Sequence, residues 1–417
     1  MAFNPNTGEF LVVAMGTDDR DLGWELILSR WNPLNSTFSP WEGLTTLPES
    51  VDKPWIVRGN PNEVASLPFS QMMSMSFGQW AQTEFYIVWT DTTPTQDFGL
   101  DYLRSTDDGF TWIGGDMLRT LGNPTTRVLS SRGWPLPRVH DDGHLYVAHI
   151  ESTFAQCARL IKFVRGDDRN DVSHMGEVQF ADLTFENGAP LAVVLNAGAD
   201  QFASRLPGWN LMSSGAGPGP GVDFAVDPTN ADRLYLVYHD SVGDCDPVET
   251  PTDTDVNIYL RALTHVAGNA WSVGPQILVA DDDDLVNETD QFMPQVVVDD
   301  RGHIHVIFYS DVNYPAQIDG SEPSRFDVWY AYSLDGGSNW QLSELCEYAG
   351  DPIPCVGPNP DPAIDSSLAF TDTDFLRDYI GIAAGADSVW TSFMGITDDD
   401  VGNPDKSVIY STRISRN

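Results

Sequence analysis

The sequence predicts an all-β protein, a six-bladed β-propeller with four-stranded antiparallel blades, and two observations carry this prediction. One phrase recurs six times along the 417 residues: a short apolar segment, a turn rich in Asp, Asn, Gly and Pro, and a second apolar segment. This combination is a β-hairpin signal. The second observation is that no stretch sustains a 3.6-residue hydrophobic period, which excludes a helical solenoid.

The six hairpins divide the chain into six similar units. Each hairpin is followed by a variable loop, a third apolar segment and, in most units, a fourth. Four antiparallel strands repeated six times describe the blades of a propeller. The hairpins are 2–18, 54–64 with 85–91, 135–151, 222–240, 294–311 and 379–393. The third strands are 24–30, 99–105, 159–166, 256–263, 327–333 and 407–413.

We expect one propeller domain over residues 1–417, in which the last unit ends on its third strand. The blades cover, in chain order, 1–50, 51–120, 130–190, 215–280, 290–350 and 375–417.

The charge of the chain excludes some classes of partner. There are 61 acidic and 22 basic residues, for a formal net charge of −39. Such a surface repels nucleic acid and anionic membranes. No apolar run is long enough to span a bilayer. We therefore expect no nucleic-acid partner and no membrane insertion.

One acidic segment is a candidate calcium site. The run Asp281–Asp284 is followed by Asn287, Glu288 and Asp290, and calcium prefers six to eight such oxygen ligands. Asp282, Asp284 and Asp290 are the candidate ligands of a structural calcium ion. No EF-hand spacing is present, so a solvated acidic loop remains the alternative.

Two turns between third and fourth strands share a sharper motif. Ser105–Trp112 and Ser333–Trp340 both fit S-x-D-x-G-x-x-W, and Thr264–Trp271 keeps only its Gly and Trp. The Asp can accept turn N–H groups, the Gly permits an unusual backbone conformation, and the Trp can pack between sheets. These residues are therefore expected to hold the blades rather than to catalyse.

With these motifs in a six-fold repeat, the whole chain resembles the sialidase-like propeller superfamily, also called the Asp-box or BNR-repeat superfamily. The resemblance implies a site on the face opposite the Asp boxes. It places Asp97 at the position of the acid/base and Tyr379 near that of the nucleophile, with Arg377 beside it. Arg205 and Arg325 lie on the same face and are further catalytic candidates.

The chain departs from that family at one inner strand. Lys53-Pro54-Trp55 stands where the family has an R-I-P motif, and Lys lacks the fork with which Arg grips a carboxylate. No Glu is well matched as a partner for Tyr379. We therefore do not expect a standard sialidase. Candidate substrate-binding residues on the face are Lys53, Trp55, Trp134, His239 and Tyr309.

Three functions remain open at this point. The leading one is an extracellular, glycan-directed propeller that binds or processes a carbohydrate. The second is a non-catalytic propeller with a protein ligand, in a surface assembly. The third is a polysaccharide lyase on an acidic glycan, with His239 or Tyr309 as the base and Arg205 or Arg325 as the neutralising group.

The cysteines favour an oxidising compartment. Cys346 and Cys355 bracket a short Pro-containing loop, a plausible local disulfide, and no C-x-x-C pair is present. The first residues, MAFNPNTGEF, show neither the basic region nor the apolar region of a signal peptide, as a secreted protein numbered from its mature start also would. We expect a secreted or cell-surface protein.

Overall fold

The computed structural model describes seventeen segments of the chain, and all structural statements below concern these residues. They are 1–17, 24–44, 51–59, 83–91, 99–116, 135–140, 144–152, 159–167, 179–195, 221–241, 256–280, 291–310, 325–345, 364–365, 380–385, 387–396 and 407–415.

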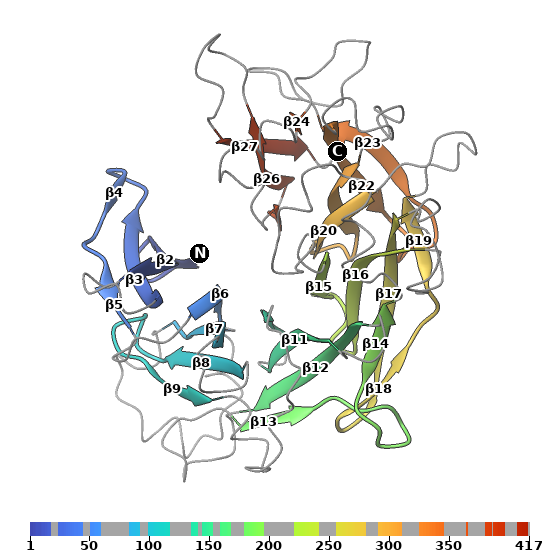
Figure 1. The fold of residues 1–417 in the computed structure, drawn as a ribbon, viewed down its shortest axis with the longest axis horizontal. Helices are drawn as coiled ribbons and strands as arrows, with labels where there is room; N and C mark the ends of the chain where they lie inside the picture. The colour runs from blue at the N-terminus through green and yellow to red at the C-terminus, as the bar shows by residue number, and fades with distance from the viewer. Residues whose placement is uncertain are drawn as a thin grey trace. The chain divides into compact units, whose positions relative to one another are not determined.

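The protein is all-β, and its described strands form six antiparallel sheets (Figure 1), the number and kind of sheet that a six-bladed β-propeller has as its blades. The predicted fold class is confirmed. Strands follow one another across each sheet in chain order. The outermost strand is split into two short pieces in four of the sheets. No helix in the described segments is long and apolar enough to cross a membrane.

The first three sheets contain fourteen strands. The first sheet consists of β1 (Ala2–Asn4), β2 (Glu9–Thr17), β3 (Trp24–Asn32), β4 (Thr37–Phe38) and β5 (Glu42–Gly43). The second consists of β6 (Val51–Arg58), β7 (Phe85–Asp91), β8 (Gly99–Ser105) and β9 (Ile113–Asp116). The third consists of β10 (Leu136–Val139), β11 (Leu145–Ser152), β12 (Arg159–Asp167), β13 (Gln179–Asp182) and β14 (Ala192–Leu195).

The last three sheets contain thirteen strands. The fourth sheet consists of β15 (Val222–Val226), β16 (Arg233–Ser241), β17 (Val256–Ala267), β18 (Ala270–Val273) and β19 (Ile277–Ala280). The fifth consists of β20 (Gln291–Val298), β21 (Ile304–Ser310), β22 (Arg325–Ser333), β23 (Gln341–Leu345) and β24 (Ile364–Asp365). The sixth consists of β25 (Gly381–Ala384), β26 (Ser388–Ile396) and β27 (Ser407–Ser415).

The contacts group the chain into two compact units, which are described separately. Unit 1 comprises 1–154, 160–193 and 265–271, and unit 2 comprises 155–159, 194–264 and 272–417. That the chain forms a single domain stays a prediction. In the sixth sheet, the described residues end on the third strand, as expected.

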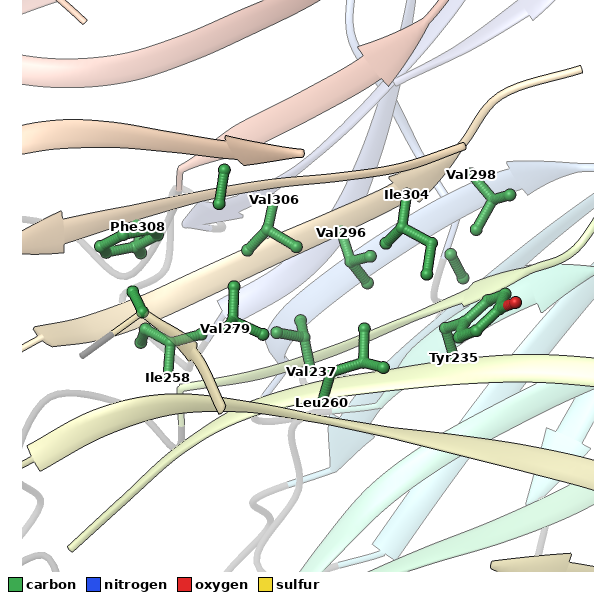
Figure 2. Packing of buried hydrophobic residues seen from close by; sticks show 13 residues of the cluster. Tyr235, Val237, Ile258, Leu260, Val279, Val296, Val298, Ile304, Val306 and Phe308 are labelled. Atoms are coloured by element: carbon green, nitrogen blue, oxygen red, sulfur yellow. The ribbon is translucent and has the colours of Figure 1, made fainter. Parts of the chain in front are cut away.

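Burial explains why the inner strands read as continuous apolar runs. Every residue of β21 (IHVIFYS) is buried, whereas most of β23 (QLSEL) is exposed or half-buried. A strand covered on both faces cannot alternate apolar and polar residues. Figure 2 shows side chains of the fourth and fifth sheets packed together, including Val237, Leu260 and Phe308. Each such side chain stabilises the fold by about 1.5–3 kcal/mol.

Unit 1 has an equivalent core between its first two sheets. Leu11 and Leu26 of the first sheet pack with Phe85 and Ile87 of the second, and all four are buried. The predicted hairpins and third strands thus pair and pack as the repeat requires.

The Asp- and Asn-rich turns of the hairpins stabilise themselves. Asp299 Oδ1 accepts the N–H groups of Arg301 and His303, at 2.8 and 2.9 Å. Asp227 Oδ1 accepts the N–H of Thr229 at 2.9 Å, and Asn4 Oδ1 accepts that of Asn6 at 2.9 Å. Short polar side chains favour these turns because they replace backbone acceptors.

Candidate functional site

The two S-x-D-x-G-x-x-W turns define one end of the sheets. In the second copy, Ser333 Oγ donates to Asp335 Oδ1 at 2.8 Å and accepts the N–H of Gly337 at 2.8 Å. Asp335 Oδ1 also accepts the N–H of Asn339 at 2.9 Å. The Ser105–Trp112 turn repeats these interactions. Both carboxylates therefore serve their own turns, as the sequence predicts.

The third, incomplete copy is held by a neighbouring segment. Thr184 donates its N–H to Asn269 O at 2.9 Å, and its own carbonyl accepts the N–H of Trp271 at 2.7 Å. Trp271 is fully buried, with its ring edge-on to Tyr146 at 5.8 Å. In this turn Val266 stands where the complete motif has Asp. The two backbone hydrogen bonds to Thr184 thus take the place of the hydrogen bonds that the Asp would accept.

The opposite end of the sheets, called here the distal end, is where second strands end and third strands begin. Unit 2 buries five polar side chains at this end, from β16, β17, β20 and β21. Asp240 pairs in register with Asn257, and Gln291 pairs with Ser310. The five buried residues are His239, Asp240, Asn257, Gln291 and Ser310. We refer to them as the distal polar cluster.

A β-bulge shapes the first strand of the fifth sheet at this end. The register of β20 against β21 shifts between Phe292 and Gln295, around Met293-Pro294. The same shift occurs in β6 between Asp52 and Trp55, around Lys53-Pro54. Proline fits a bulge because it has no N–H to give to the ladder.

Side chains of the fourth sheet cap the open edge of β20. Met293 donates its N–H to His239 Nδ1 at 3.2 Å, and Val296 donates its N–H to Asp223 Oδ2 at 3.0 Å. Both contacts are buried. An edge strand exposes N–H groups that must find acceptors. By accepting two of them, His239 and Asp223 join the fourth sheet to the fifth.

Aromatic residues lie beside the polar cluster. Phe292 and Tyr309 pair in register, with ring centroids 5.6 Å apart, and both are buried. Burial raises the pKa of Tyr238 to about 12, although Arg261 Nε donates to its hydroxyl at 2.9 Å. Tyr238 is therefore a neutral phenol at physiological pH and cannot act as a ready base.

The structure places only some of the predicted site residues. His239 and Tyr309 are buried at the distal end of unit 2, and Trp55 is half-buried in β6 of unit 1. Lys53 and Arg325 lie in β6 and β22, where only their backbone is described. The remaining predicted residues lie outside the described segments: Asp97, Trp134, Arg205, Asp282, Asp284, Asp290, Arg377 and Tyr379.

Sequence reasoning missed Asn257, Gln291 and Met293. The available signal was a polar residue inside an apolar strand, as in VNIYL at 256–260. The alternation of side chains along a strand does not predict which of these polar residues lie at the same end of two neighbouring sheets.

No group of three or more His, Cys, Asp or Glu side chains that could hold a metal ion occurs in the part of the chain that is described. The predicted calcium ligands lie beyond that part, so calcium remains a prediction. The four cysteines lie there as well.

Comparisons with known proteins give likeness of fold only. No family model matches the chain, and no curated protein matches it. The solved structure of the Hadza microbial sialidase Hz136 aligns with 99% of this chain at 13% identity and a TM-score of 0.46. The chain spans 64% of the length of that sialidase.

Two further solved structures align at similar levels. The alignment with a PL25 ulvan lyase covers 99% of this chain and 82% of the lyase chain, at 10% identity and a TM-score of 0.44. The alignment with the GH93 α-L-arabinofuranosidase of Fusarium graminearum covers 78% of this chain and 77% of the enzyme chain, at 15% identity and a TM-score of 0.39. The six antiparallel sheets themselves agree with the predicted resemblance to sialidase-like propellers.

Proposed function

We propose that this chain is an extracellular, glycan-directed propeller that binds or processes a carbohydrate at the distal end of its sheets. The observation that carries the proposal is the distal polar cluster. Its imidazole, carboxylate, two carboxamides and hydroxyl are buried at the same end of two packed sheets.

The chemistry of the cluster suits a sugar. Burying polar groups is costly unless they are hydrogen-bonded, so proteins concentrate them where they serve structure or a ligand. Carboxamides and carboxylates offer the paired donors and acceptors that neighbouring sugar hydroxyls require. Phe292 and Tyr309 pack beside the cluster as part of the hydrophobic core and hold its strands in place.

The end of the sheets that carries the two complete S-x-D-x-G-x-x-W turns offers, by contrast, no comparable chemistry in those turns. The carboxylates of Asp107 and Asp335 are already occupied by N–H and hydroxyl groups of their own turns. A ligand site at the distal end therefore agrees better with the distribution of buried polar groups.

Incubation with defined glycans tests the proposal. The purified protein is mixed with 3′-sialyllactose, an oligogalacturonate and a neutral xylo-oligosaccharide. Binding is followed by calorimetry and products by mass spectrometry, with calcium and with a chelator because of the predicted ligands Asp282, Asp284 and Asp290. A released sugar would establish a glycosidase, and an unsaturated product would establish a lyase.

Variants link any signal to the cluster. We expect Asn257→Ala and Gln291→Ala each to weaken binding about tenfold, the loss of roughly one hydrogen bond. Leu334→Ala is the control, because Leu334 is 58% exposed at the opposite end. Folded protein that neither binds nor alters any of the three glycans would contradict the proposal and favour the protein-interaction alternative.

A further inference from the structure

One turn of unit 1 displays an asparagine in the pattern of an N-glycan acceptor. Asn35-Ser36-Thr37 fits N-x-S/T, with a residue other than proline in the middle. The three residues lie where the turn after β3 leads into β4. All three are exposed, and the preceding Leu34 is 95% exposed. The asparagine thus lies at the tip of a turn that a modifying enzyme can reach.

Thr37 fixes the orientation of the Asn35 carboxamide. Asn35 Oδ1 accepts the Thr37 N–H at 3.2 Å and the Thr37 hydroxyl at 2.6 Å. A backbone N–H can only donate, so the carboxamide atom that faces it must be the oxygen. Nδ2, the atom to which an N-glycan is attached, makes no hydrogen bond within the described segments.

Two other turns of unit 1 share the backbone part of this arrangement but not its hydroxyl. Asn187 Oδ1 accepts the N–H of Ala189 at 3.0 Å, two residues further along the chain. Asn32 Oδ1 accepts the N–H of Leu34 in the same way, at 2.9 Å. Neither Ala189 nor Leu34 has a hydroxyl, so neither turn fits the acceptor pattern. One other match in the sequence, Asn287-Glu288-Thr289, lies outside the described segments.

We propose that Asn35 is an N-glycosylation site, modified by an oligosaccharyltransferase that uses a lipid-pyrophosphate-linked oligosaccharide as donor. In this transfer a bond forms between Asn35 Nδ2 and the anomeric carbon of the first sugar. The bond from that carbon to the pyrophosphate oxygen breaks, and the lipid pyrophosphate leaves with the electron pair. Nδ2 gives up one proton to a base of the transferase.

The modification is independent of the proposed carbohydrate site. It rests on the extracellular location in the proposed function, but not on glycan binding, because the turn between β3 and β4 lies at the opposite end of its sheet from the distal end. The competing explanation is that Asn35 serves only its own turn, through the two hydrogen bonds from Thr37.

Glycosylation of the purified, folded, full-length chain tests the proposal. The protein is incubated with a single-subunit oligosaccharyltransferase and a lipid-pyrophosphate-linked oligosaccharide, and the modified residues are identified by mass spectrometry of the peptides. We expect a glycan on Asn35 and none at that position in Asn35→Gln. An unmodified Asn35, in a reaction that glycosylates a free acceptor peptide, would overturn the proposal. Modification of Asn287 alone would overturn it as well.

Substitutions at the hydroxyl position separate acceptor recognition from exposure. We expect Thr37→Ala to reduce modification of Asn35 to background, and Thr37→Ser to restore most of it, because serine retains the hydroxyl. Melting temperatures show that each variant is folded. Full modification of Asn35 in folded Thr37→Ala would contradict the assignment of this acceptor pattern.

Ala189→Thr gives the reverse test, because it supplies the hydroxyl that the exposed Asn187 turn lacks. We expect Asn187 to become glycosylated in this variant and to stay unmodified in the wild-type protein. Modification of Asn187 in Ala189→Thr without modification of Asn35 would overturn the proposal. Failure of all three glycans to bind would contradict the proposed function and leave the result at Asn35 unchanged, so the two failures are distinguishable.

Discussion

Gly109 of the second sheet lies directly against Leu11 of the first, because a Cβ built on Gly109 would come within 2.4 Å of Leu11 Cδ2. Arg30 completes this junction in unit 1: its Nη2 donates to Gly109 O at 2.7 Å. Its guanidinium also stacks over Phe110, 4.3 Å from the ring centroid. The Ser105–Trp112 turn therefore joins two neighbouring sheets.

We expect Gly109→Ala to lower the free energy of unfolding by about 2–4 kcal/mol. Its φ of +80° adds left-handed strain to the clash with Leu11. Gly8→Ala is the matched control, since Gly8 has a φ of +73° but nothing within 4 Å of the added Cβ. We expect Gly8→Ala to lower the free energy of unfolding only by the contribution of backbone strain, about 1–2 kcal/mol. Urea unfolding measures both variants, and equal losses would show that contact with Leu11 is unimportant.

Asp335 should make the protein sensitive to acid. Hydrogen bonds from the side chain and N–H of Asn339, and from Ser333, lower the pKa of Asp335 from 3.8 to about 2. A lowered folded-state pKa stabilises the fold above the unfolded value, and this stabilisation is lost as the pH falls from about 4 to about 2.

Calorimetric melting temperatures between pH 2 and pH 6 measure this effect. We expect Asp335→Asn to flatten the acid part of the curve relative to the wild-type protein. Asp300→Asn removes an exposed carboxylate outside the Ser333–Trp340 turn, and so controls for the loss of one negative charge. A curve for Asp335→Asn that parallels the wild type below pH 4 would count against the prediction.

Tyr330 should matter more than its neighbour Tyr332, because it belongs to a buried chain of hydrogen bonds. Its hydroxyl lies 2.6 Å from His305 Nδ1, and His305 Nε2 lies 3.4 Å from Asp299 Oδ2. Tyr330→Phe removes the phenol partner from a buried imidazole, which should cost about 1–3 kcal/mol.

Tyr332→Phe provides the comparison. The Tyr332 hydroxyl bonds to Gln341 at an exposed position, so water can replace it. We expect a change within about 0.5 kcal/mol, as for surface substitutions in general. Chemical denaturation of the two variants decides the matter: a loss for Tyr332→Phe as large as that for Tyr330→Phe would refute the ranking.

The repeat made most of the fold predictable. The predicted third strands at 24–30, 99–105, 159–166, 256–263, 327–333 and 407–413 fall within, or on, the bounds of β3, β8, β12, β17, β22 and β27. Their success has a local cause. β-branched and aromatic runs bounded by Asp, Asn and Gly specify strands and turns through neighbouring residues alone. The hydrogen bonds of Asp107 and Asp335 were predictable for the same reason, since each spans at most four residues.

The site was less predictable because it depends on residues distant in the chain. His239 was named from its place in the repeat, but its partner Met293 lies 54 residues away on another sheet. Local sequence specifies the strands that carry these two residues. Only the packing of one sheet against the next decides that an imidazole meets the N–H of a bulged edge strand, because side-chain contact is set by that tertiary geometry and not by the spacing of residues.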